Sequence, residues 1–324
     1  MSVRVCENDH PNWEDVDLVH GFDLRASHVR EARSRGLPVC LSPIYWSKAY
    51  RFESVRYHGL VPESLHRARM VTILALAALR GRHVAKAEAL VSWTIETRAL
   101  YESVDLLLPN SGLEAEELRR ELGVTTPVRV IPNGVDPDRF RMPGDGLRRE
   151  GILYVGRIEP HKNQLGLIEA TRGLNSTLTL VGVDHPDHKD YALRVRRAGG
   201  RGVRILGYVP DARLPELYSR AQIHAIPSRF ETTGLVSLEA ALCGCNIVTT
   251  RAGYAREYFE DDAWYCDPYD PHSIREAVVA ALSAPPPESL RKRILARYTW
   301  EQTALETADA YRELLERTPR RCLA

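Results

Sequence analysis

The chain has 324 residues, and its 44 Lys plus Arg nearly balance 43 Asp plus Glu. The length suggests two domains of roughly 150 residues each, and the balanced charge gives no global field that favours nucleic acid or a membrane. The longest apolar run, residues 70–79, is too short to span a bilayer, and residues 1–17 lack the apolar segment of a signal peptide.

The six cysteines and the Asp-x-Asp motif at 15–17 do not predict a metal site. Only Cys243 and Cys245 lie close together in the chain, and no second pair or nearby histidine completes a zinc spacing. The Asp-x-Asp motif at 15–17 runs directly into the apolar residues 18–22, which favours the start of a strand. We therefore expect no metal, and reduced thiols in a cytoplasmic enzyme.

Short apolar runs in the first half alternate with segments of helical period. The runs at 17–22, 38–42, 104–109 and 128–132 predict strands, and the segments at 24–36, 64–79, 84–101 and 111–122 predict helices. Turn-forming residues fill 133–146, which predicts an interdomain linker.

The second half has the same alternation in a clearer form. Strands are predicted at 152–156, 177–182, 203–207, 223–228 and 246–250, and helices at 163–172, 189–198, 211–220 and 234–243. After residue 270 only helices are predicted, at 271–283, 287–297 and 299–317. Strands that are apolar on both faces indicate a parallel sheet covered by helices on both sides, which is a Rossmann-like α/β domain. Ligands bind such sheets outside the carboxyl ends of the strands.

Glu239 lies in an unusual place for a carboxylate. On a helix over 234–243 it shares a face with Leu235, Leu238 and Leu242. A buried carboxylate without partners costs several kcal/mol. Glu239 is therefore either held by protein donors or ready to accept hydrogen bonds from a ligand's hydroxyl groups, and the helix alone does not decide between them.

The start of the same helix has the features of an anion site. Thr233 is a suitable N-cap, and Gly234 lets a ligand approach the backbone. The first free amides and the helix dipole favour a phosphate there. Glu231 lies just ahead of this site, where we expect it not to be buried.

Two cations follow the predicted strand 152–156. Arg157 and Lys162 lie in the strand-to-helix loop at the carboxyl edge of the sheet, where a diphosphate would find both a planar guanidinium and a compact ammonium group. Taken alone, the two cations are better explained as solvated surface charges, but their shared edge with residues 233–235 favours a ligand site.

A series of motifs in order then carries a resemblance to a known family. These motifs are PNSGLEAEELRRELGV, VIPNGVDPDRF, ILYVGRIEPHKNQLGLIEA, LVG, LGYVPDARLPELYSRAQIHAIPSRFETTGLVSLEAALCGCNIVTT and YTWEQTALETADAYRELL, within residues 104–317. In them the chain resembles family 4 retaining glycosyltransferases of the GT-B architecture. The resemblance implies two Rossmann-like domains facing across a cleft, the first one shortened. They would be an acceptor-side domain at 1–140 and a nucleotide-sugar domain at 147–298, with the helix 299–317 packing back on the first.

The resemblance also implies an activity and a role for each matching residue. The chain would move a sugar from a nucleoside-diphosphate sugar, of the UDP or GDP type, to a hydroxyl acceptor with retention and without a metal or cofactor. Arg157 and Lys162 would hold the diphosphate, Glu231 would contact the transferred sugar, and Glu239 would bind the ribose hydroxyls. The remaining donor contacts would come from Gly156, Gly207, Tyr208, Thr233, Gly234 and Leu235. Attack would occur on the front face, so Glu231 is not assigned as a nucleophile.

The first half departs from the family pattern. No strand with a glycine-rich loop precedes residue 17, and SPIYWS at 42–47 stands where the family often has a histidine. Three residues are candidates for contact with the sugar or acceptor: His20, Tyr45 and Asn133. A histidine in a strand that is satisfied by the protein itself is an equally good interpretation of His20.

Residues 48–86 form a basic segment with eight Lys or Arg and two Glu, which gives a net charge of +6. The favoured interpretation of this segment is a pair of helices that pack over a core and expose their charged side chains to solvent. An anionic membrane surface with a lipid-linked acceptor comes second, and nucleic-acid phosphates come third. We accordingly expect a cytoplasmic protein, with peripheral contact at the inner face of the membrane as one open alternative, and a glycan, lipid-linked or other hydroxyl acceptor.

Two other functions stay open. One is another GT-B enzyme such as a sugar-nucleotide epimerase. The other is a non-catalytic donor-binding subunit that needs a partner chain.

Overall fold

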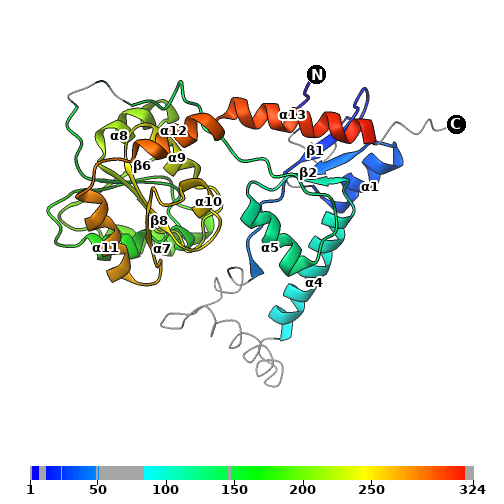
Figure 1. The fold of residues 1–324 in the computed structure, drawn as a ribbon. Coiled ribbons are helices and arrows are strands. Elements are labelled where there is room, and N and C mark those ends of the chain that lie inside the picture. Colours follow the sequence, from blue (N-terminus) through cyan, green and yellow to red (C-terminus); the bar gives the residue numbers. More distant parts are fainter. Residues whose placement is uncertain are drawn as a thin grey trace.

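The computed structural model describes residues 2–6, 12–22, 24–48, 50, 84–142, 144 and 147–317. These residues fold into two α/β units, each built on a parallel sheet (Figure 1). The predicted helix at 64–79 and nearly all of the basic segment 48–86 lie outside the described residues.

The larger sheet has six strands in the order β6-β5-β4-β7-β8-β9, and all its neighbours pair in parallel. Its strands are β4 (Ile152–Val155), β5 (Leu178–Val181), β6 (Val203–Gly207), β7 (Ile223–Ile226), β8 (Asn246–Thr250) and β9 (Trp264–Cys266). The chain builds outward from β4 to β6, then returns and builds the other way from β7. The switch in direction lies between β4 and β7, and ligands of such sheets bind in the crevice at that point.

Helices cover both faces of this sheet (Figure 1). One face carries α6 (Gln164–Thr171), α7 (Lys189–Ala198) and α11 (Pro271–Leu282), and the other carries α8 (Leu214–Arg220), α9 (Leu235–Leu242) and α12 (Glu288–Arg297). A hydrophobic core lies on each face of the sheet, and alternate residues of β4 pack into the two cores. Ile152 packs on the α6 side and Leu153 on the α9 side. Every residue of β4 and β7 is buried, which explains why both appear in the sequence as unbroken apolar runs.

The smaller sheet has three parallel strands in the described residues, β1 (Val19–Gly21), β2 (Val39–Leu41) and β3 (Leu106–Leu107). The helices α1 (Ala26–Ser34), α4 (Val84–Glu102) and α5 (Gly112–Leu122) belong to this unit. The predicted strand at 128–132 is wrong as a full strand, because Val128 forms only an isolated bridge with Leu107.

Two chain segments that connect the units lie side by side. The helix α13 (Trp300–Arg317) starts beside the larger unit and packs Ala310 and Leu314 against Cys40 of the smaller sheet (Figure 1). At its start Val135 forms a bridge with Thr299, and its amide donates to Tyr298 O at 2.9 Å. A Cβ atom on Gly134 would lie 2.2 Å from the Thr299 carbonyl carbon, so only glycine fits at this crossing.

The sequence predicted the other helices and strands of both units in type and approximate position. The helices after residue 270 are confirmed, whereas β9 and the short helix α10 (Arg256–Phe259) were not predicted. Among the residues that the structure describes, no helix is both long and apolar enough to cross a membrane.

The helix α10 joins the two units through polar contacts. The Glu257 carboxylate accepts hydrogen bonds from the amides of Gly112 and Leu113, at 2.8 and 2.9 Å, and so caps the start of α5. The Tyr258 hydroxyl donates to Asn110 O at 2.6 Å. A carboxylate at a helix N-terminus is favourable both as a hydrogen-bond acceptor and through the helix dipole.

Replacing Glu257 by alanine is therefore expected to lower the free energy of unfolding by about 1–2 kcal/mol. Chemical denaturation of the purified variant would measure this loss. Glu276→Ala is a matched control, because the Glu276 carboxylate is exposed and its nearest partner is His272 in the next helical turn. Equal stability of the Glu257 and Glu276 variants would mean that the contact between the units contributes nothing.

Candidate active site

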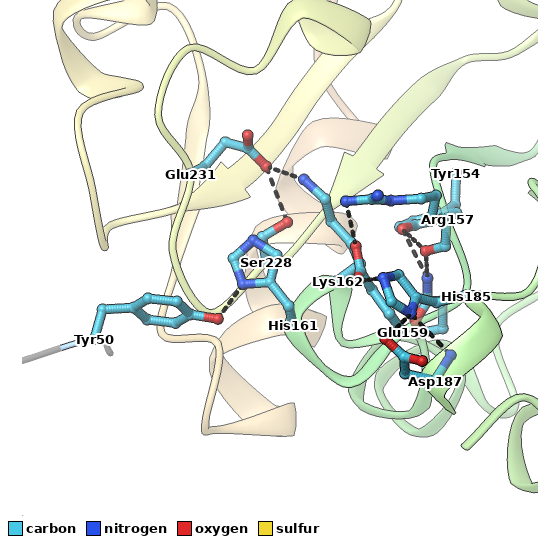
Figure 2. A network of polar contacts seen from close by, with 11 residues as sticks. Tyr50, Tyr154, Arg157, Glu159, His161, Lys162, His185, Asp187, Ser228 and Glu231 are labelled. Atoms are coloured by element: carbon cyan, nitrogen blue, oxygen red, sulfur yellow. Dashed lines mark hydrogen bonds and ion pairs between the residues drawn. The ribbon is translucent and has the colours of Figure 1, made fainter. Parts of the chain in front are cut away.

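Lys162 and Glu231 meet at the switch point of the larger sheet. Lys162 ends the 3-10 helix η1 (Pro160–Lys162) after β4, and Glu231 follows β7. The Lys162 ammonium donates to Glu231 Oε2 at 2.9 Å, and the Ser228 hydroxyl donates to the same oxygen at 3.0 Å (Figure 2). An ammonium group has three N–H donors, so Lys162 can hold this carboxylate and still bind a phosphate.

Glu231 is buried, with 7% of its surface exposed, so the expectation that it would not be buried is wrong. The segment at 252–255 folds over Glu231. The Glu231 amide donates to Ala252 O, and the Glu231 carbonyl accepts from the Tyr254 amide at 2.8 Å. Burial acts to raise the pKa of the Glu231 carboxyl. The Lys162 charge and hydrogen bond outweigh burial, so the pKa lies below its ordinary value. The buried carboxylate is thus ionised and acts as an acceptor.

Arg157 lies in the same loop as Lys162 but has a different partner. Its Nη2 is 3.3 Å from Glu159 Oε1, and 61% of its side chain is exposed (Figure 2). An exposed guanidinium group can turn toward a ligand at small cost, because surface ion pairs contribute little. Arg157 and Lys162 therefore share one sheet edge, as predicted, each beside a carboxylate.

The helix α9 begins at this edge with free donors. Gly234 is its N-cap in the left-handed conformation (φ +75°), so Thr233 is not the cap that the sequence predicted. The first helical amides that bond back into the helix belong to Ser237 and Leu238. The amides ahead of them need acceptors from outside the helix.

Asn133 reaches this helix from the other unit. Its side-chain amide donates to the Thr233 hydroxyl at 3.2 Å, and its backbone amide donates to the Tyr258 hydroxyl at 3.1 Å. The PNGVD motif thus lies against the start of α9, next to the amides of Gly234 and Leu235.

Glu239 occupies the middle of α9 and is half-buried. The Tyr218 hydroxyl donates to its Oε2 at 3.0 Å. Burial raises the pKa of this carboxyl to about 7, although the Tyr218 hydrogen bond and the Arg139 charge act to lower it. One Glu239 oxygen has a protein donor, which supports a carboxylate held by the protein. The group also stays partly accessible, which supports a carboxylate that accepts hydrogen bonds from a ligand's hydroxyl groups.

Three further predicted donor residues end strands at the same edge. Gly156 follows β4, and its amide donates to Val181 O at 2.9 Å. Gly207 ends β6 with φ +67°, and Tyr208 after it has 71% of its surface exposed. The geometry places all three at the carboxyl edge without fixing what they bind.

Two predicted sugar contacts are not supported by the structure. His20 has both ring nitrogens hydrogen-bonded, to the Tyr311 hydroxyl at 2.5 Å and to the Ser42 hydroxyl at 2.8 Å, and burial lowers its pKa to about 4. Tyr45 is 1% exposed, and its hydroxyl donates to Glu121 at 2.7 Å. Both side chains are therefore satisfied within the smaller unit.

An aromatic contact near Lys162 was missed. His161 stacks on Trp46, with ring centroids 4.8 Å apart, and its Nδ1 forms a hydrogen bond with the Tyr50 hydroxyl (Figure 2). Burial and the Lys162 charge lower the pKa of His161 to about 4. Trp and Tyr shortly after a strand end at the domain interface were the available signal in the sequence.

Comparisons with known proteins agree with this geometry. The model "Glycosyltransferase Family 4" matches residues 12–139, and the model "Glycosyl transferases group 1" matches residues 143–297. D-inositol 3-phosphate glycosyltransferase 2 of Catenulispora acidiphila is 33% identical over 248 residues, which cover 66% of this chain and 57% of that protein. The chain thus spans a little over half of that relative.

Solved structures show the same fold. Sucrose-phosphate synthase from Thermosynechococcus elongatus matches with a TM-score of 0.65 and 24% identity, over 89% of this chain and 76% of that one. Anabaena HepE, solved with UDP and glucose, matches with a TM-score of 0.61 and 17% identity, over 91% and 98%. The two family models lie on either side of the linker and between them match most of the chain, so the chain belongs to glycosyltransferase family 4 and has the GT-B fold.

Proposed function

We propose that this chain transfers a sugar from a nucleoside-diphosphate sugar to a hydroxyl acceptor, with retention at the anomeric carbon. The observation that carries the proposal is the Lys162–Glu231 pair at the switch point, beside the free amides of α9. One edge of the sheet thus offers cations and amides for a diphosphate, and carboxylates for hydroxyl groups.

Each group has a distinct part in the proposed reaction. Lys162, Arg157 and the amides at 233–235 bind the diphosphate and stabilise the charge that develops on it as the glycosidic bond breaks. Glu231, held ionised by Lys162, accepts hydrogen bonds from the transferred sugar, and Glu239 accepts them from the ribose. The acceptor oxygen bonds to the anomeric carbon on the face that the leaving group vacates, and the acceptor proton passes to a leaving phosphate oxygen.

The donor class is proposed from chemistry and from relatives. HepE was solved with UDP and with UDP-glucose, and we propose a donor of the UDP or GDP type for this chain. We propose that the reaction needs no metal and no cofactor, because Lys162 and Arg157 supply positive charge. Cys40, Cys243, Cys245 and Cys266 are buried thiols outside any disulfide, which supports the proposed cytoplasmic location. The acceptor is proposed as a glycan, lipid-linked or other hydroxyl compound.

A thermal-shift panel tests the proposal. Purified chain is mixed with UDP, GDP, ADP, dTDP and their common sugar conjugates, and the unfolding temperature is measured. Ligands that bind only the folded chain raise its stability by about 2.7 kcal/mol at a hundred times Kd. We expect one nucleotide to stabilise the chain and its sugar conjugate to stabilise it further.

The other outcomes are equally informative. No shift with any nucleotide would contradict the proposal and favour a donor-binding subunit that needs a partner chain. Interconversion of the free nucleotide sugar, without transfer to any acceptor, would identify an epimerase.

A further inference from the structure

A group of metal-ligating side chains lies beside Arg157 and takes no part in the proposed transfer. Glu159, His185 and His188 each offer one ligand atom, and these atoms lie within 4.8 Å of one another. In the part of the chain that the structure describes, this is the one such group of three. The geometry points to a binding site for a divalent transition-metal cation, of the Zn²⁺ class, formed by these three side chains.

The fold brings the ligands together from two strand ends. Residues after β4 and β5 continue side by side, because Ile158 bridges Asp184 and the His185 amide donates to Ile158 O at 3.2 Å. His185 precedes the 3-10 helix η2 (Pro186–His188), which ends at His188. Side chains three residues apart on a 3-10 helix eclipse one another, so both imidazoles lie on one side, with ring centroids 4.9 Å apart.

Glu159 is the observation that points to a cation. Its side chain is 8% exposed, and its buried Oε1 lies 3.3 Å from Arg157 Nη2 but accepts no well-aligned hydrogen bond among the described residues. Its Oε2 lies 3.9 Å from His185 Nε2 (Figure 2). A buried carboxylate that accepts no well-aligned hydrogen bond is unfavourable, and a metal ion bound to it through Oε2, or through both oxygens, would stabilise it.

The donor set selects the metal. Two imidazoles and one carboxylate are a common ligand set for zinc, which leaves a fourth position for water or another group. Around tetrahedral zinc, with bonds of about 2.0–2.2 Å, ligand atoms lie roughly 3.3 Å apart. The partly exposed His188 side chain can make most of the inward movement that this requires.

His185 Nε2 is the ring nitrogen that faces Glu159, 3.9 Å from its Oε2, so it would be the one that binds the metal. In the metal-free arrangement His185 Nδ1 accepts a hydrogen bond from the Asp187 amide. A metal on Nε2 places the ring proton on Nδ1, which breaks the hydrogen bond from the Asp187 amide, and Asp187 Oδ2, 4.0 Å from Nδ1, then becomes the acceptor for that proton (Figure 2). Such an outer carboxylate typically orients a metal-binding histidine, and its loss weakens metal affinity about tenfold or more.

Metal binding would also act on Arg157. Since Arg157 pairs with Glu159 at 3.3 Å, a cation bound to Glu159 would compete with that ion pair and leave the guanidinium free. This consequence rests on the proposed function, in which Arg157 binds the donor diphosphate. The metal would then tighten donor binding while leaving kcat at saturating donor unchanged.

Cobalt titration of the whole chain tests the site without reference to activity. The chain is treated with EDTA, desalted and titrated with Co²⁺ while visible absorption is recorded, and Zn²⁺ is then added as competitor. We expect one equivalent of Co²⁺ with a tetrahedral spectrum that Zn²⁺ abolishes. The same should hold for His272→Ala, a control at an exposed histidine on α11.

The ligand variants decide the assignment. His188→Ala changes a partly exposed side chain, so the variant should fold normally, and Glu159→Gln keeps the shape of the buried Glu159 side chain. Both should lose the tetrahedral spectrum. An unchanged spectrum in either variant would overturn the site, as would a sulfur-to-cobalt charge-transfer band, which would place the metal on cysteine.

A second titration addresses Arg157. The affinity of the stabilising nucleotide is measured with and without Zn²⁺ in the wild type and in His188→Ala. The variant lacks the proposed site, so any effect of Zn²⁺ in it comes from direct binding of Zn²⁺ to the nucleotide. We expect Zn²⁺ to tighten binding about fivefold or more in the wild type alone. Equal effects in both proteins would refute the coupling to Arg157, and failure of every nucleotide to bind would refute the proposed function while the cobalt result stands.

Discussion

Lys162→Met is expected to reduce turnover by about a hundredfold or more, since removing one charge-stabilising group from an active site typically has an effect of this size. The lysine supplies a positive charge where the leaving diphosphate gains negative charge. The measurement is kcat with the donor that the thermal-shift panel identifies. Lys292→Met is the control, because Lys292 is an exposed lysine whose partner is Glu288 on the same helix.

The same variant should lose stability, and this effect must be separated from catalysis. Removing Lys162 leaves Glu231 buried and without its cation, which costs about 3–5 kcal/mol in comparable buried pairs. The double variant Lys162→Met, Glu231→Gln removes both charges and should recover much of the stability. Recovery of turnover together with stability would show that Lys162 serves folding and not the reaction.

The sequence predicted the larger sheet well because both of its faces are buried. A run such as β7, apolar at every position and bounded by polar residues, has few other structures open to it. The strand β9 was missed because its three residues, Trp264–Cys266, are too short a run to show a period. The segment 128–132 was overpredicted: it lies beside β3, which has only two residues, and forms a single bridge with it at Leu107.

The sequence predicted that the site lies at one edge of the sheet, but it did not predict which side chains pair with one another there. The spacing of Glu231 and Glu239 and the positions of Arg157 and Lys162 follow from local patterns. The partners of these residues depend on which loops the fold brings together, as when Gly253 lets a second strand of backbone lie directly against Glu231. The group at Glu159 was missed for the same reason, because its ligands follow two different strands.

Glu239→Gln is expected to weaken nucleotide binding by about ten- to a hundredfold, the effect of losing hydrogen bonds from ligand hydroxyls to a charged acceptor. It should also raise the unfolding temperature of the ligand-free chain at pH 8. Folding raises the pKa of this carboxyl from 4.5 to about 7. A group of this kind favours the folded state below pH 4.5, and that contribution is lost as the pH rises to about 7 and the buried carboxyl ionises. The glutamine avoids this loss.

The pH dependence of binding distinguishes the two interpretations of Glu239. If the ionised carboxylate accepts the ribose hydroxyls, wild-type affinity should rise between pH 6 and pH 8, around the raised pKa of about 7, and Glu239→Gln should show a flat profile. A sugar conjugate is the proper ligand, because its diphosphate has no terminal phosphate that titrates in this range. If Glu239 only anchors Tyr218, the glutamine variant should instead be less stable and bind the conjugate as the wild type does. If Glu239→Gln raises the stability of the chain but lowers its affinity for the conjugate, the carboxylate destabilises the fold and is retained because the ligand needs it.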